Sequence, residues 1–97
     1  MTNVKLIRMW TGEDVIADLV KENGDWIVIK NPIVAVPSTT QGQIGFAPWS
    51  PLIKGKNVEI EVTRRYVVYI NEPQDDIIGQ YDLMFSNIAT PPKKLIL

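Results

Sequence analysis

The chain offers few residue types that could carry out catalysis. It contains no histidine and no cysteine, which excludes the commonest general base, the commonest metal ligand and all thiolate chemistry. Two of its clustered acidic residues, Asp14 and Asp18, would lie about 13 Å apart on one face of a strand. A paired-carboxylate site needs two acids that converge in a cleft. We therefore expect no catalytic residue, no metal site and no cofactor, and we interpret the protein as not an enzyme.

An arginine pair is the clearest candidate for binding. Arg64 and Arg65 precede an aromatic and β-branched run in "TRRYVVYI", although the whole chain has 10 Lys and Arg against 11 Asp and Glu, a formal net charge of −1. One interpretation is a solvated strand edge, where each arginine pairs with a nearby glutamate (Glu59, Glu61 or Glu72) and contributes about 0–1 kcal/mol. The other interpretation is a contact for a phosphate or a base. The residues alone leave both open.

Tryptophan supplies the second candidate for binding. The chain has three, at positions 10, 26 and 49, which is many for 97 residues. A tryptophan beside a loop can stack on a base, a contact that stabilises by roughly 1–3 kcal/mol, but packing in the core or between subunits is the commoner role. Trp26 follows the Asn23-Gly24 turn, so of the three tryptophans it has the weakest case for burial.

The elements that must position these residues are mainly strands. Frequent turn signals separate short segments rich in Val, Ile, Trp and Tyr, a pattern typical of an all-β sheet or barrel. Asn23-Gly24 is the strongest hairpin signal, because both residues tolerate positive φ. Pro32 would interrupt its strand, so we expect a bend or an edge there. The predicted strands cover residues 4–9, 14–22, 25–36, 44–49 and 58–63, with the run 66–70 continuing or following the last.

The hydrophobic period changes from that of a strand to that of a helix over residues 74–88. Asp75 and Asp76 fall in the first turn, where the helix dipole favours acids. The expected buried face comprises Ile77, Tyr81, Met84, Phe85 and Ile88, and we expect it to cover the open side of the sheet. Residues 89–97 form a tail. We interpret residues 1–97 as one domain of a cytoplasmic protein with no membrane partner, because no apolar run is long enough to span a bilayer.

Two segments resemble the motifs of the Sm and Sm-like (LSm, Hfq-like) proteins. Residues 4–36 resemble the first Sm motif, in which Gly12 matches the turn glycine. Its apolar positions are matched by Val15, Leu19, Ile27 and Ile29. The stretch "TRRYVVYI" resembles the second motif, where an Arg-Gly pair precedes the final strand, although no glycine follows the arginines here. The motifs cover somewhat less than half of the chain, which is also similar to small Sm-like proteins of marine bacteriophages of the cyanophage type.

The resemblance implies a strongly bent five-stranded antiparallel sheet, or open barrel, with the helix at its C-terminal end. It also implies a homo-oligomeric ring, in which the fourth strand of one subunit pairs with the fifth strand of the next. The loops after the second strand and before the fifth would line the pore. The implied RNA-binding candidates are Asn23, Asp25, Trp26, Arg64, Arg65 and Tyr66. The subunit-interface candidates are Ile44, Phe46, Val67, Val68, Tyr69 and Ile70.

The resemblance implies two partners: copies of the same chain and single-stranded RNA. It implies a role in RNA metabolism, in the cytoplasm of a bacterial host if the chain is phage-encoded. An alternative stays open, because the second motif lacks its glycine. In that alternative the ring is a protein-interaction or structural module that does not bind RNA.

Overall fold

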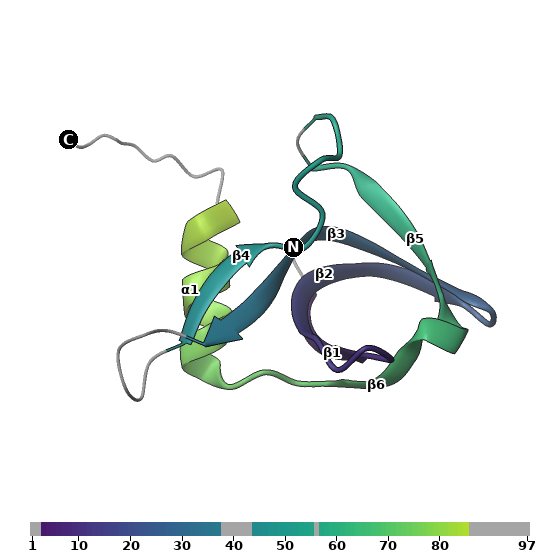
Figure 1. The fold of residues 1–97 in the computed structure, drawn as a ribbon, viewed down its shortest axis with the longest axis horizontal. Helices are drawn as coiled ribbons and strands as arrows, with labels where there is room; N and C mark the ends of the chain where they lie inside the picture. The colour runs from purple at the N-terminus through teal and green to yellow at the C-terminus, as the bar shows by residue number, and fades with distance from the viewer. Residues whose placement is uncertain (1–2, 38–43, 56, 86–97) are drawn as a thin grey trace.

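The computed structural model describes residues 3–37, 44–55 and 57–85, and this part of the chain is mainly β with one α-helix at its C-terminal end (Figure 1). A 3-10 helix, η1 (Arg64–Tyr66), joins the last two strands, and the α-helix is α1 (Asp75–Phe85). The strands are β1 (Val4–Met9), β2 (Asp14–Asn23), β3 (Trp26–Pro37), β4 (Ile44–Pro48), β5 (Glu59–Thr63) and β6 (Val67–Asn71). The predicted mainly-β architecture with a C-terminal helix is confirmed.

All strands belong to one antiparallel sheet in the order β4-β3-β2-β1-β6, with β5 also paired to β3. The sheet therefore has six strands, one more than the resemblance implies. The additional strand fits because β3 has two neighbours on one edge: residues 26–30 pair with β5 and residues 33–37 pair with β4. Because β5 and β6 are joined by η1 and do not pair with each other, the sheet is not closed within the described residues.

β3 changes partner at Asn31 and Pro32. Asn31 has a φ of 53°, a left-handed conformation that asparagine adopts more readily than a β-branched residue. Pro32 has no N–H to donate to a neighbouring strand, while its carbonyl accepts a hydrogen bond from the backbone N–H of Trp49 at 3.1 Å. The Asn31 side chain also donates to Asn57 Oδ1 at 2.9 Å. The interruption predicted from Pro32 is thus confirmed, and it releases the second half of β3 to pair with β4.

Two apolar clusters lie on opposite faces of the sheet. Along β2, Val15 and Ala17 belong to the larger cluster while Ile16 belongs to the smaller one, as expected when successive side chains alternate between faces. The larger cluster comprises Ile7, Met9, Val15, Ala17, Leu19, Ile27, Ile29 and Val62. The smaller comprises Val4, Ile16, Ile33 and Tyr81. Burial on both faces explains why residues 15–19 of β2 are buried without interruption.

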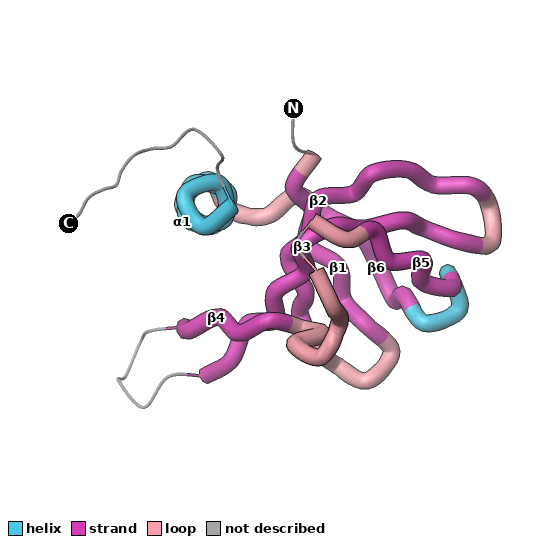
Figure 2. The backbone as a smooth tube through the Cα atoms, turned by 90° about the horizontal axis from the view of Figure 1, so that it is seen from above, coloured by secondary structure: helices cyan, strands magenta, loops and turns pink. Residues whose placement is uncertain are grey.

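Helix α1 covers the smaller cluster chiefly through Tyr81, which is 1 % exposed. Figure 2 shows the helix beside the sheet, at the end opposite the β2–β3 turn. Ile77, Ile78 and Phe85 pack against the same cluster and are half-buried. Asp75 and Asp76 occupy the first turn, as predicted. No helix of the described residues is long and apolar enough to cross a membrane.

The expected burial of Met84 is wrong. Its side chain is 50 % exposed, because α1 meets the sheet through Tyr81 and the side of the helix that carries Ile77 and Ile78, which leaves Met84 at the rim of an apolar groove. The end of the predicted helix, residues 86–88 with Ile88, lies outside the described residues, as does the tail 89–97.

Candidate nucleic-acid-binding surface

The 3-10 helix η1 lies between two turns of the sheet. At its start, the N–H of Arg64 donates to the carbonyl of Asp25 at 2.9 Å. At its end, the carbonyl of Tyr66 accepts a hydrogen bond from the N–H of Trp10 at 2.7 Å. Thr63 caps η1, with its hydroxyl accepting from the N–H of Arg65. The β2–β3 turn, η1 and the β1–β2 turn therefore meet at one end of the molecule.

This meeting brings the six predicted RNA-binding residues together. Asn23, Asp25 and Trp26 surround Gly24, whose φ of 70° closes the β2–β3 turn. Trp26 pairs with Thr63, the residue directly before η1, so the turn stands beside the arginines and Tyr66 (Figures 1 and 2). Trp26 is 46 % exposed, in line with its weak case for burial, and Trp10, at 75 %, is more exposed still. We call these six residues the η1 surface.

The two arginines of the η1 surface have different surroundings. Arg64 forms an ion pair with Glu22 of β2, which was not among the glutamates considered from the sequence. Glu72, one of those glutamates, pairs instead with Lys5 of β1. Arg65 is exposed and forms no ion pair with another described residue. The interpretation of a solvated ion pair therefore holds for Arg64, and Arg65 is the cation of the pair that is available to an anionic partner.

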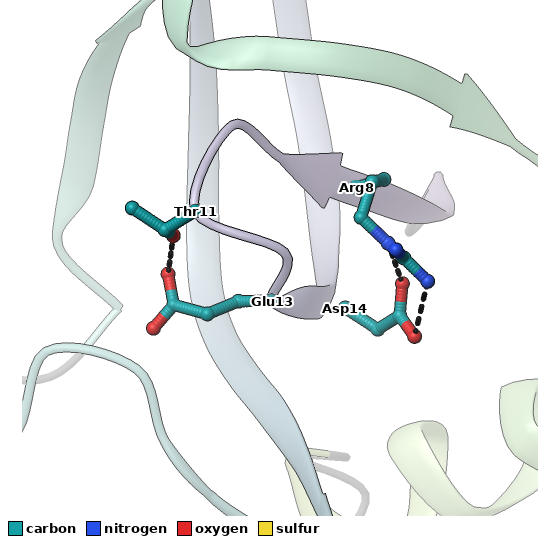
Figure 3. Close-up of polar contacts among 4 residues, drawn as sticks. All are labelled: Arg8, Thr11, Glu13 and Asp14. Atoms are coloured by element: carbon teal, nitrogen blue, oxygen red, sulfur yellow. Dashed lines mark hydrogen bonds and ion pairs between the residues drawn. The ribbon is translucent and has the colours of Figure 1, made fainter.

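A chain of hydrogen bonds fixes the β1–β2 turn beside η1. The Tyr66 hydroxyl donates to the hydroxyl of Thr11 at 3.2 Å, and Thr11 in turn donates to Glu13 Oε1 at 2.9 Å (Figure 3). The same oxygen accepts from the indole N–H of Trp49 at 3.3 Å. Sequence reasoning did not connect these residues, since they come from three segments. The only local signal was the Thr11-Gly12 turn.

A second polar contact joins β1 to β2, and β6 lies on the other side of β1. Arg8 donates to both carboxylate oxygens of Asp14, at 2.6 and 3.1 Å (Figure 3). The hydrogen bond to Asp14 and its negative charge raise the pKa of Arg8. The Arg8 guanidinium also lies 5.9 Å from the ring centroid of Tyr69, within the range of a cation–π contact. Arg8 thus contacts Tyr69 of β6, one of the interface candidates.

The six interface candidates fall into two groups. Val67 and Ile70 of β6 and Phe46 of β4 are half-buried against the clusters of their own chain. Val68, Tyr69 and Ile44 are exposed. Val68 lies at a register shift between β1 and β6, where Arg8 pairs with Tyr69 and Met9 with Val67. The outer edges of β4, β5 and β6 have no strand partner within the described residues.

Two concave regions lie near these strand edges, one beside β4 and one along β6. The larger, of about 620 Å³, is mostly apolar and lies between α1, the bend of β3 and the segment after β4, with Phe46, Ile53 and Met84 among its walls. The smaller, of about 460 Å³, runs along β6 and is bounded by the Arg64–Glu22 and Lys5–Glu72 ion pairs. Neither contains a group of three or more residues that could hold a metal ion, and none occurs elsewhere in the described part of the chain.

Comparison with known proteins adds no family assignment: no family model and no curated protein matches this chain. The function must therefore be argued from the η1 surface and the strand edges.

Proposed function

We propose that the chain is an Sm-like protein that assembles into a homo-oligomeric ring and binds single-stranded RNA at the η1 surface. The observation that carries the proposal is the convergence of Trp26, Arg65 and Tyr66 on one end of the sheet, from segments about forty residues apart. An exposed indole provides a stacking platform for a base, and a cation beside it neutralises a phosphate.

The strand order supports the ring part of the proposal. Strands β6, β1, β2, β3 and β5 form a continuous path through five strands, and these would be the five strands of the Sm-like sheet. β4 would then be an addition. A ring would pair the outer edge of β5 with the outer edge of β6 from the next copy, which would cover Val68 and Tyr69. Ile44 and Phe46 would lie away from this contact.

A second candidate function keeps the ring but not the RNA. Two observations favour it: the Arg64–Glu22 ion pair already neutralises one of the two arginines, and the apolar groove beside α1 would suit a protein partner. In this alternative the chain is a protein-interaction or structural module. A location in the cytoplasm of a bacterial host remains a prediction.

Assembly and binding can be tested on one sample. We expect light scattering at micromolar concentration to report a multiple of the 11.0 kDa chain mass. Fluorescence anisotropy with labelled uridine and adenosine dodecamers, at two salt concentrations, should detect binding. Arg65→Gln should weaken it and flatten its dependence on log salt by about 0.7 for each phosphate that the variant no longer neutralises.

Two control variants sharpen this test. Lys54→Gln removes the same charge from the exposed segment after β4 and should leave both affinity and salt slope near those of the unmodified protein. Arg64→Gln should have a smaller effect on binding than Arg65→Gln, because Arg64 is already paired. A monomeric mass contradicts the ring. A ring that binds neither dodecamer refutes the RNA function and favours the interaction module.

A further inference from the structure

The β1–β2 turn exposes a tryptophan on a fixed backbone. Trp10 is 75 % exposed, although three backbone hydrogen bonds hold the turn: Met9 N–H to Glu13 O at 2.9 Å, Gly12 N–H to Met9 O at 2.9 Å, and Trp10 N–H to Tyr66 O at 2.7 Å. Met9 before it is fully buried. Rigid presentation of a large aromatic side chain lowers the entropy lost on binding. Trp10 is thus well placed to contact a partner.

We propose that Trp10 is a second stacking platform for single-stranded nucleic acid, at the opposite end of η1 from Trp26. This inference rests on the proposed RNA function and extends its binding path. The N–H of Arg64 faces the β2–β3 turn and the carbonyl of Tyr66 faces Trp10, so the two turns flank η1 along its axis. Arg65 stands in the middle of η1, between the two platforms.

The spacing of the two platforms sets the length of nucleic acid that can reach both. A three-residue 3-10 helix is about 6 Å long. With a hydrogen bond at each end, the flanking backbones lie about 12 Å apart. A stacked strand advances about 3.4 Å per step between nucleotides, so about five nucleotides are needed to reach from Trp26 to Trp10. A trimer would occupy one platform only.

The surroundings of Trp10 favour nucleic acid over a protein partner. Protein hot spots lie within well-packed patches, whereas the next residues, Thr11 and Gly12, are exposed and bring no large apolar side chain. The backbone N–H of Trp10 donates to Tyr66 at the end of η1, and Arg65 of η1 has no ion-pair partner among the described residues. A contact between copies through Trp10 is the competing outcome, and the experiment below separates the two.

The test compares Trp10→Ala with Trp10→Phe in the full chain, by anisotropy with fluorescein-labelled uridine and adenosine dodecamers. Loss of one stacked base corresponds to roughly a 5- to 150-fold weaker affinity. We expect Trp10→Ala to fall in this range and Trp10→Phe to retain most of the affinity. Leu83→Ala, which shortens an 83 % exposed apolar side chain on α1, is the matched control and should change nothing. In competition assays, affinity should rise from trimer to hexamer for the unmodified protein, and Trp10→Ala should abolish that rise.

Three results would overturn the inference. If Trp10→Ala binds within twofold of the unmodified protein while Trp26→Ala and Arg65→Gln bind weakly, RNA binding stands and Trp10 lies outside its path. If Trp10→Ala changes the mass of the assembly, Trp10 is a subunit contact. If the unmodified protein binds none of the oligonucleotides, this inference falls together with the proposed function.

Discussion

Replacement of Tyr81 by Phe should destabilise the protein through a single lost oxygen atom. Tyr81 joins α1 to the sheet: its hydroxyl accepts the N–H of Asp18 at 3.1 Å and lies 3.0 Å from the carbonyl oxygen of Lys30 and 2.9 Å from that of Asn31. The hydroxyl has one proton, which the two carbonyls share. Tyr81→Phe keeps the ring, its packing in the smaller cluster and its 4.7 Å contact with Phe85.

The expected magnitude follows from what the substitution leaves behind. The N–H of Asp18 is buried with its residue, which is 7 % exposed, and would lose the acceptor that Tyr81 provides. A buried donor without an acceptor costs about 1–3 kcal/mol. For a domain of this size each kcal/mol lowers the Tm by about 4–8 °C. We therefore expect Tyr81→Phe to lower the free energy of unfolding by about 2 kcal/mol and the Tm by about 10 °C.

Urea unfolding followed by far-UV circular dichroism measures this difference, at one fixed protein concentration because assembly would affect stability. Tyr66→Phe is the control. It removes the same atom from an exposed hydrogen bond, that to Thr11, where water can replace it, and it should cost less than about 0.5 kcal/mol. A Tyr81→Phe loss no larger than that of the control would show that the hydroxyl does not hold the helix to the sheet.

Two further predictions concern the same region. Burial raises the pKa of Tyr81 above its ordinary value of 10.0, so above about pH 10 the unfolded chain loses this proton while the folded chain keeps it. The free energy of unfolding should therefore fall as the pH rises past this value. Urea titrations at about pH 9 and pH 11 should show a smaller fall for Tyr81→Phe than for the unmodified protein. Asn31 has a φ of 53°, so Asn31→Val should lower the free energy of unfolding by about 1–3 kcal/mol through backbone strain. Asn31→Gly should lower it distinctly less in the same urea assay. Equal losses for the two variants would place the cost in the hydrogen bond to Asn57 instead.

The local elements of the fold were predictable because their signals are local. The Asn23-Gly24 turn, the interruption at Pro32 and the acids that begin α1 depend on residues adjacent in sequence, and all three occur as expected. The partners of β3 were not predictable. Its division between β5 and β4 depends on where the bend directs the second half of the strand, which involves a hydrogen bond to the distant Trp49. The burial of Met84 failed for a similar reason, since helical spacing defines a stripe but not how much of it the sheet covers.

The candidate site shows the same division. Residue type alone identifies Trp26 and the arginines as candidates for binding, and the resemblance to Sm-like proteins places them in one group. Their actual proximity depends on the pairing of Trp26 with Thr63. The partner of Arg64 was missed because Glu22 lies 42 residues away in sequence, and only glutamates near the arginines in sequence were considered. The sequence did not place Trp10 beside η1 because its contact with Tyr66 is made through the backbone, which carries no sequence signal.

The charges of the η1 surface explain why assembly and RNA binding belong together in the proposal. Within one copy, Glu22 neutralises Arg64, and Asp25 adds a negative charge to the same surface. A single Arg65 with one or two indoles would hold RNA weakly, since each phosphate contact contributes little at physiological salt. A ring multiplies these contacts: once one copy has bound a strand, its neighbours meet the same strand at a high effective concentration. A chain with a net charge of −1 can then hold an anionic polymer without a strongly basic surface of its own.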